Sequence, residues 1–297
     1  MFENKQYLKF IEKSKKQDLD LVGVSVIQTL GSTYAKAGNL MLINSNFEFV
    51  GVFGSKHLHK QILEYAKTAF KNQKSKYFEN IPKDESSGHG TSKYFLQVFL
   101  KKDDYGVLGL ALKNLDKTLI RNIKSDDYVF TDRTTVTKFE DDKFYQEIKM
   151  PYSILIFGSG AHVTSFISMA NLMGWKTTIM DININKDYVS EVDKIIELEN
   201  FEDILTMDLS EYNASVILSH SPKTDDTYLK ALLNSKVEYI GVMGNKISMR
   251  DKKEKFKLEE DKRFFAPVGF EIGGHTHQSV ALSICAQIEA RKNGKIH

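Results

Sequence analysis

The chain is poor in several residue types, and each shortage excludes a class of protein. Its one cysteine, Cys285, cannot form an internal disulfide or a metal site built from cysteine ligands. With 4 prolines and 18 glycines among 297 residues, a collagen-like chain is excluded. No apolar run approaches the roughly 18 residues of a membrane span, so we expect no membrane partner.

Charge of one sign is also lacking. Lys and Arg number 41 against 39 for Asp and Glu, which leaves a formal net charge of +2. That balance is not typical of a nucleic-acid binder, so no nucleic-acid partner is expected. Residues 1–6 lack the basic and then apolar layout of a secretory signal. We therefore expect a cytoplasmic protein.

The length predicts two domains, because a domain averages about 150 residues. Hydrophobic residues make up 41% of the chain, enough for ordinary globular cores. The pattern changes at Pro151, after which short apolar strands alternate regularly with helical stretches. We place the boundary at Met150, with an α+β domain over residues 1–150 and a second domain over residues 151–297.

The first half shows strand and helix patterns of unequal strength. Apolar residues at alternate positions predict strands, whereas apolar residues three or four apart after Gly54 predict a helix. Residues 83–92 are rich in serine and glycine, which is typical of a surface loop. The expected strands cover residues 21–27, 40–43, 47–53 and 94–100.

The second half favours a parallel sheet. Several of its expected strands are apolar on both faces, as in a sheet covered by helices on two sides. The sequence therefore predicts an α/β domain, a Rossmann-like doubly wound sheet. Its expected strands cover residues 154–157, 176–181, 215–219 and 237–242.

A glycine motif follows the first of these strands. Gly158-Ser159-Gly160 matches the dinucleotide fingerprint, with Val163 in place of the third glycine. Gly158 permits the strand-to-helix turn, and Gly160 lets backbone N–H groups approach a diphosphate. Asp181 ends the next strand, where a carboxylate accepts hydrogen bonds from ribose hydroxyls. The motif predicts a diphosphate nucleotide such as NAD, with a tight turn that binds nothing as the alternative.

Further cofactor candidates lie near the ends of the later strands. His220 follows the third strand, and Gly241 and Gly244 bracket the end of the fourth, at the edge where open α/β sheets bind ligands. Glu271 lies in a glycine-containing loop and is a candidate acid or ligand.

Three residues receive structural interpretations. Asp225 and Asp226 lie at an expected helix start, where aspartate is a favoured cap and complements the helix dipole, so capping explains at least one of them. Cys285 shares an apolar helical face with its neighbours, which is typical of a core position.

Taken together, these residues resemble the XdhC/CoxI family, whose members are linked to the maturation of molybdenum hydroxylases. The resemblance extends along most of the chain in two blocks, and the C-terminal block is the more specific. The matching segments are residues 29–38, 41, 50–51, 157–160, 174–181, 219–220, 225–226, 239–244 and 266–273.

The resemblance implies a maturation chaperone that binds the molybdenum cofactor or its molybdopterin dinucleotide. It further implies support for sulfuration of the cofactor and its transfer to the apo-enzyme of a molybdenum hydroxylase. A sulfurtransferase is then a second partner, and we expect a homodimer. An NAD-dependent oxidoreductase and a nucleotide- or metal-sensing regulatory protein remain alternatives.

The chain departs from the family at its cysteines. Family members commonly carry a Gly-Gly-Cys motif, which corresponds here to residues 53–57 and places His57 at or beside the cysteine. A second glycine motif corresponds to residues 88–90, again without cysteine. Imidazole is neither a sulfur carrier nor a soft ligand. The chain therefore resembles the family as a divergent member of it.

Two pairs of histidines could replace these thiols as ligands. His57 and His59, like His275 and His277, are spaced so that both rings lie on one side of an extended chain. With Glu271 they could form a metal site of nitrogen and oxygen ligands. The alternative is that they are exposed loop histidines with no common partner.

Overall fold

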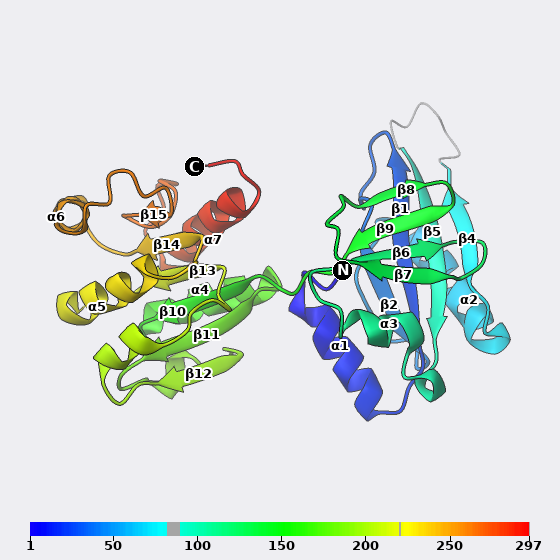
Figure 1. The fold of residues 1–297 in the computed structure, drawn as a ribbon, viewed down its shortest axis with the longest axis horizontal. Coiled ribbons are helices and arrows are strands. Elements are labelled where there is room, and N and C mark those ends of the chain that lie inside the picture. Colours follow the sequence, from blue (N-terminus) through cyan, green and yellow to red (C-terminus); the bar gives the residue numbers. More distant parts are fainter. Residues whose placement is uncertain (82–89, 220, 297) are drawn as a thin grey trace. The chain divides into compact units, whose positions relative to one another are not determined.

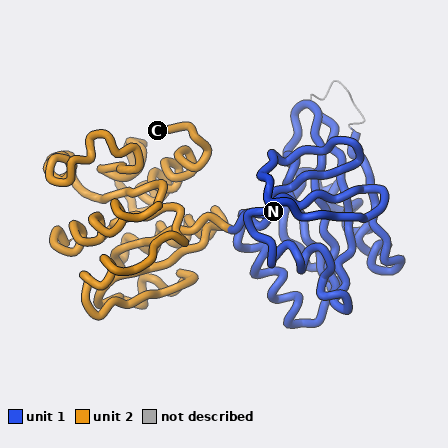
Figure 2. Tube along the Cα trace, viewed as in Figure 1, with its two compact units in different colours: residues 1–150 blue, residues 151–297 orange. Residues whose placement is uncertain are grey.

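The computed structural model describes residues 1–81, 90–219 and 221–296. It divides into two compact units, residues 1–150 and residues 151–297 (Figure 2). Within the described residues, no helix is long and apolar enough to cross a membrane. We describe each unit by itself.

The first unit is built around an antiparallel five-stranded sheet in the order β3-β2-β1-β5-β4 (Figure 1). Helices precede and follow its strands along the chain. The strands are β1 (Leu21–Leu30), β2 (Leu40–Asn44), β3 (Phe49–Val50), β4 (Lys76–Asn80) and β5 (Thr91–Phe99). The helices are α1 (Lys5–Lys16), α2 (Lys56–Asn72), the 3-10 helix η2 (Lys101–Asp103) and α3 (Gly106–Ala111).

The two faces of β1 pack against different partners, as alternation along a strand requires. Val22, Val24 and Val26 belong to the hydrophobic core that includes the apolar face of α2. Ser25, on the opposite face, accepts a hydrogen bond from Arg121 of the second sheet at 3.1 Å. The period-two pattern of the sequence therefore correctly separates the two faces of this strand.

The second sheet of this unit has four antiparallel strands in the order β7-β6-β9-β8. It contacts the first sheet through a small core of Ile27, Phe95 and Phe144. The sequence pattern between residues 101 and 150 is too weak to predict it. Its strands are β6 (Thr118–Asn122), β7 (Tyr128–Thr131), β8 (Lys138–Glu140) and β9 (Lys143–Glu147).

The second unit contains a parallel six-stranded sheet, which confirms the predicted fold class. Its order, β12-β11-β10-β13-β14-β15, is that of the Rossmann fold, and the order reverses between β10 and β13. The strands are β10 (Ser153–Phe157), β11 (Lys176–Asp181), β12 (Lys194–Glu197), β13 (Ala214–Ile217), β14 (Tyr239–Val242) and β15 (Phe264–Phe265).

Helices cover both faces of this sheet (Figure 1). Residues of α4 and α7 pack in one core, and residues of α5, α6 and η4 pack in the other. The helices are α4 (Ala161–Leu172), η3 (Lys186–Tyr188), η4 (Phe201–Thr206), α5 (Pro222–Leu233), α6 (Lys246–Phe256) and α7 (His277–Lys292).

Some expected boundaries need correction. The strand expected over residues 47–53 shrinks to Phe49–Val50, because Phe47 has φ 62° and Gly51 has φ 93°, which extended strands do not accommodate. The loop expected over residues 83–92 ends earlier, since β5 begins at Thr91. Residues 82–89 lie outside the described part of the chain.

Candidate functional site

The glycine turn lies at the point where the strand order of the second sheet reverses. Gly158 follows β10 with φ 107°, and a Cβ there would lie 2.8 Å from the backbone nitrogen of Ser219. Gly160 is the N-cap of α4. Val163 is fully buried in the core beneath that helix, so the residue replacing the third glycine is a packing residue.

A histidine missed in the sequence lies at the same edge. The Nε2 atom of His162 is 2.8 Å from the carbonyl oxygen of Leu218, so its ring crosses from α4 to the end of β13. A Cβ on Gly160 would meet this ring at 2.9 Å. The His162 ring also lies 6.3 Å from that of His277, at the start of α7. In the sequence, the position of His162 directly after the glycine turn could have identified it as a residue of this edge.

Asp181 lies at the end of β11, as predicted, but it is only 8% exposed. Its Oδ1 accepts hydrogen bonds from the Tyr228 hydroxyl at 2.6 Å and from the Ile182 N–H at 2.8 Å. Tyr228 comes from α5, and its ring stacks on Phe157 at the end of β10. The hydrogen bond from Tyr228 therefore ties α5 to the carboxyl edge of the sheet.

The other predicted cofactor residues are scattered. Gly241 lies inside β14, where a Cβ would meet Val268 at 2.4 Å, so its packing explains the glycine. Gly244 lies beyond that strand and lines a pocket. Glu271 is exposed and forms an ion pair of 3.7 Å with Lys246. His220 lies outside the described residues.

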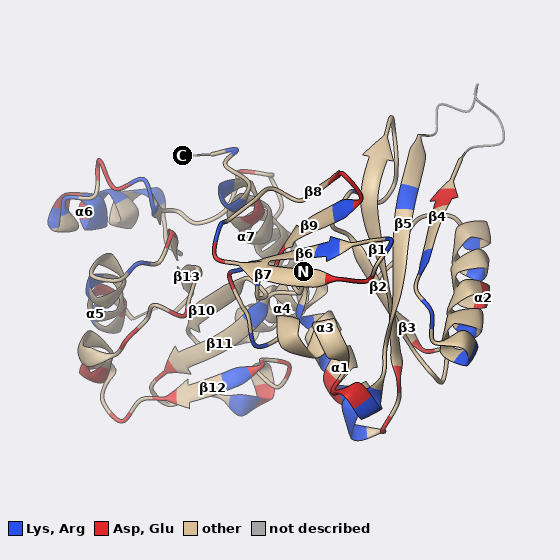
Figure 3. Ribbon diagram, turned by 45° about the vertical axis from the view of Figure 1, so that its right-hand side comes forward, with Lys and Arg blue, Asp and Glu red and all other residues tan. Residues whose placement is uncertain are grey.

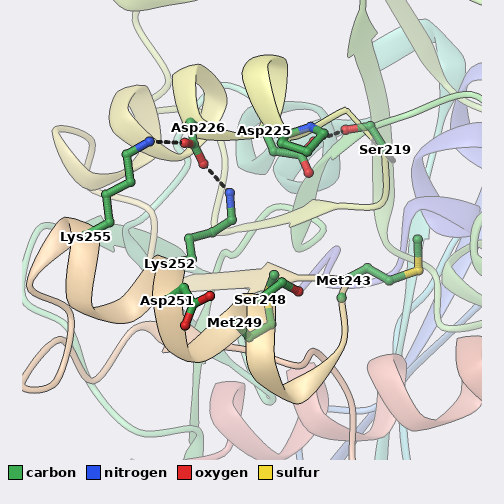
Figure 4. A pocket seen from close by; sticks show the side chains of 11 residues that line it. Ser219, Asp225, Asp226, Met243, Ser248, Met249, Asp251, Lys252 and Lys255 are labelled. Carbon is green, nitrogen blue, oxygen red and sulfur yellow. Dashed lines mark hydrogen bonds and ion pairs between the residues drawn. The ribbon is translucent and has the colours of Figure 1, made fainter.

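The pocket opens between α5 and α6, beside the ends of β13 and β14 (Figure 4). Its volume is about 320 Å³, within the range of about 300–1,000 Å³ typical of small-molecule sites. Polar and apolar side chains share its lining. They are Ser219, Pro222, Asp225, Asp226, Met243, Gly244, Ser248, Met249, Asp251, Lys252 and Lys255.

Two adjacent carboxylates in this pocket have different surroundings. Asp226 receives hydrogen bonds from Lys252 and, at 2.5 Å, from Lys255. Burial opposes ionisation of Asp226, but these hydrogen bonds outweigh it and hold its pKa below the ordinary value. Burial raises the pKa of Asp225, although Ser219 donates a hydrogen bond to it.

Neither aspartate is the cap residue of α5, which corrects the expectation that at least one of them caps the helix. Ser221 is the cap residue of α5, and Pro222 is the first residue of the helix. Asp225 lies in the first turn of α5, where an acidic residue complements the helix dipole as predicted, and its carboxylate accepts a hydrogen bond from Ser219. The proline in the sequence indicates where the helix starts, but the cap residue can be identified only from the backbone conformation.

The expected histidine ligands belong to two different units. His57 lies in α2, and His59 accepts a hydrogen bond at 3.1 Å from the N–H of Phe53 in its own unit. His275 lies in the second unit, in an exposed loop before α7. Among the described residues, no group of three or more His, Cys, Asp or Glu could hold a metal ion.

Cys285 lies in the core, as its helical spacing predicts. Its side chain packs among α4 and α7 residues and is only 3% exposed. Burial raises the pKa of its thiol to about 12. Burial and the raised pKa both disfavour the reactive thiolate form of Cys285 in the folded chain.

The sequence matches two family models. Residues 154–288 match the XdhC Rossmann domain, and residues 15–80 match the XdhC and CoxI family. The chain belongs to the XdhC family. The glycine turn, Asp181 and the whole pocket lie within the matched Rossmann domain.

Curated relatives match about half of the chain. It is 22% identical over 148 residues to a probable xanthine dehydrogenase subunit of Bacillus subtilis, covering 49% of this chain and 44% of that protein. It is 27% identical over 150 residues to the uncharacterized protein YqeB of Escherichia coli, covering 47% of this chain and 27% of that one. The match thus spans less than half the length of either relative.

A solved structure shares the fold across the chain. A crystal structure described as a xanthine dehydrogenase from Bacillus halodurans matches with a TM-score of 0.78 and 19% identity. The match covers 99% of this chain and 96% of that one. At this identity the likeness shows the fold alone.

Proposed function

We propose that this chain is an accessory protein that holds a diphosphate-containing form of the molybdenum cofactor and delivers it to an apo molybdenum hydroxylase. The observation that supports this most is the glycine turn at the reversal point of a Rossmann sheet in a member of the XdhC family. Open α/β sheets bind their ligands at this point.

The residues of the turn fit a diphosphate. Gly158 has a positive φ, and its missing side chain lets the turn lie directly against Ser219. The first turn of α4 leaves backbone N–H groups without intrahelical acceptors, and the helix dipole favours an anion there. Ala161, the first residue of α4, is exposed, so a ligand can reach this helix end.

The state of Cys285 limits the proposed role to holding and delivery. It is the only cysteine in the sequence, and its thiol is buried with a raised pKa. Sulfur carriage needs an accessible thiolate. Sulfur for the cofactor would therefore come from a partner sulfurtransferase, not from this chain.

The names of two relatives agree with a role in the maturation of a molybdenum hydroxylase. One curated relative and one solved structure are described as xanthine dehydrogenase proteins. Xanthine dehydrogenase is a molybdenum hydroxylase, which makes such an apo-enzyme the proposed partner of this chain. We further propose that the chain acts as a homodimer.

A calorimetric titration tests the proposed ligand. Ala161→Asp places a carboxylate where the diphosphate would bind, while Asp in the first helical turn is compatible with folding. We expect the unaltered chain to bind molybdopterin dinucleotide and Ala161→Asp to bind it at least tenfold more weakly. Ala161→Asn, which adds the same bulk without charge, is the matched control and should lose less.

The position of Asp181 supports a second candidate, an NAD-dependent oxidoreductase. A carboxylate at the end of the second strand is where Rossmann domains hold the ribose diol and disfavour a 2′-phosphate. Titrations with NAD and NADP decide between the two. Tight binding of NAD with no binding of molybdopterin dinucleotide would replace the accessory role, and Asp181→Arg should then weaken NAD but not NADP.

A further inference from the structure

Asp225 is a buried acceptor at the wall of the pocket. Its residue is only 7% exposed, and Ser219 donates a hydrogen bond to its Oδ1. Figure 4 shows its side chain on α5 beside the space between α5 and α6. A carboxylate can accept more hydrogen bonds than this one, so a ligand with N–H donors would meet unused acceptor capacity there.

The lysines of α6 are committed to the neighbouring carboxylate. Lys252, whose side chain is 10% exposed, and Lys255 both form ion pairs with Asp226. Figure 3 shows how densely basic residues are placed along α6. Asp225 is therefore the buried carboxylate in this pocket whose hydrogen bond comes from a neutral group.

The lining favours a flat ligand that donates hydrogen bonds and carries no negative charge. Asp225 and Asp251 disfavour a phosphate, and the charges of Lys252 and Lys255 are already paired with Asp226. Met243, Met249 and Pro222 supply apolar walls, and methionine side chains adapt to aromatic rings. Gly244 keeps this space open, since a Cβ there would press on Met249 at 2.5 Å.

We propose that this pocket binds a heterocycle with a 2-amino-4-oxopyrimidine edge, as in pterin and guanine, whose ring N–H and amino group donate to the Asp225 carboxylate. This rests on the proposed function, for which it names the recognised part of the cofactor. Two parallel N–H donors match the two oxygens of a carboxylate. Adenine and cytosine present a donor beside an acceptor on the corresponding edge and do not match.

The pocket adjoins the glycine turn through one residue. The backbone nitrogen of Ser219 lies 2.8 Å from where a Cβ of Gly158 would be, and the Ser219 hydroxyl donates to Asp225. Ser219 therefore touches both sites. One ligand that carries a heterocycle and a phosphate could occupy the pocket and the start of α4 together.

Probes without phosphate test the pocket alone. The unaltered chain is titrated with 6-hydroxymethylpterin and with 6-hydroxymethyllumazine, which carries a second oxo group in place of the amino group. Pterin fluorescence and calorimetry give the affinities. We expect the pterin to bind at least tenfold more tightly than the lumazine. Guanosine and adenosine are compared in the same way. Whether the chain binds guanosine, the pterin or both shows which of the two heterocycles the pocket recognises.

Variants locate the effect. Asp225→Asn replaces one acceptor by a donor and should weaken pterin binding at least tenfold. Glu260→Gln removes the same charge from an exposed residue of the same unit that does not line the pocket, and it should change the affinity less than twofold. Ala161→Asp should weaken the dinucleotide but not the free pterin, which separates this inference from the diphosphate site.

Equal affinities for pterin and lumazine would overturn the inference, and so would full pterin affinity in Asp225→Asn. Failure of every probe to bind the unaltered chain at millimolar concentration would also overturn it. Dinucleotide binding that is lost in Ala161→Asp would then still support the proposed function.

Discussion

The two units each bury a charged side chain, and they treat it differently. In the first unit, Arg121 is 1% exposed and donates hydrogen bonds to Gln97, Gln146 and Ser25, all neutral oxygens. In the second unit, Asp225 is 7% exposed and lines a pocket. The arginine is enclosed between two sheets, whereas the carboxylate faces a space that a ligand can fill.

Burial shifts the pKa of both groups toward the neutral form, but the consequences differ. It lowers the pKa of Arg121 to about 9 and raises that of Asp225. Oxygens of Gln97, Gln146 and Ser25 accept hydrogen bonds from the two terminal nitrogens of Arg121, while its buried Nε has no partner among the described residues. The carboxylate receives its described hydrogen bond from Ser219 alone. A buried charge indicates a binding site when part of its hydrogen-bonding capacity faces a cavity.

The largest expected effect comes from removing the enclosed charge. Arg121→Leu would leave Gln97, Gln146 and Ser25 facing an apolar side chain, so we expect the first unit to lose about 3 kcal/mol or more of unfolding free energy. Urea unfolding followed by circular dichroism measures this loss. The sole tryptophan, Trp175, lies in the second unit, and its fluorescence reports that unit separately.

Arg133→Leu is the matched control, since Arg133 is exposed and should cost less than about 0.5 kcal/mol. An unchanged urea midpoint in Arg121→Leu would show that the buried guanidinium is not structural. The comparison between the two buried charges would then fail.

The next largest effect on stability is expected at the glycine turn of the second unit. Gly158→Ala forces a side chain into a positive φ and against the backbone of Ser219, so we expect a loss of about 2–3 kcal/mol. Gly160 has an ordinary φ of −79°. The Cβ atom of Gly160→Ala would meet only the ring of His162, which can move. This substitution should cost less than about 1 kcal/mol. Equal losses in the Trp175 transition would contradict this difference.

The sequence predicted the fold where regular patterns repeat. Apolar strands and the glycine turn were enough for the Rossmann sheet, because parallel strands buried on both faces have a distinct composition. The second sheet of the first unit was missed, since its strands are short and polar on one face. Two strands of the Rossmann sheet were not predicted: β12 is short, largely exposed and charged at both ends, and β15 has only two residues.

The candidate site was predicted less completely, and the reason is physical. The glycine turn follows from local sequence, but the pocket brings together Ser219, Asp225 and Lys252 from different elements. Asp225 and Asp226 are adjacent and chemically identical in the sequence. Only the fold shows that α6 supplies lysines to Asp226, whereas Asp225 accepts its hydrogen bond from the neutral Ser219.

Substitution of Asp225, the buried carboxylate at the pocket, should have a smaller effect on stability, and of opposite sign. Burial raises the pKa of Asp225 in the folded state, and nearby Asp226 and Asp181 act in the same direction, against Ser219 and Lys252. Between the unfolded and folded pKa values the folded chain binds more protons, so stability falls as pH rises through that window. Asp225→Asn should therefore stabilise the second unit at pH 7 by about 0.5–2 kcal/mol.

The gain should shrink as pH falls below the folded pKa of Asp225, because the parent carboxyl is then neutral as well. Trp175 fluorescence in urea at several pH values measures it. If Asp225→Asn is less stable than the parent at pH 7, Asp225 has the structural role that we assign to Arg121, and the contrast between the units disappears.

The smallest functional effect is expected at a buried group of the second unit that faces no pocket. Cys285 packs in the core between the sheet and its helices, and burial raises its thiol pKa to about 12. Iodoacetamide at pH 8 should therefore leave the folded chain unmodified and should alkylate it in urea. Cys285→Ala should cost roughly 1 kcal/mol of stability and change dinucleotide affinity less than twofold. Rapid alkylation of the folded chain, or a persulfide found on Cys285 by mass spectrometry after incubation with a sulfurtransferase, would instead make this thiol part of the function. The second unit would then carry two functional buried groups, and exposure to a pocket would no longer distinguish Asp225 from the enclosed charge of the first unit.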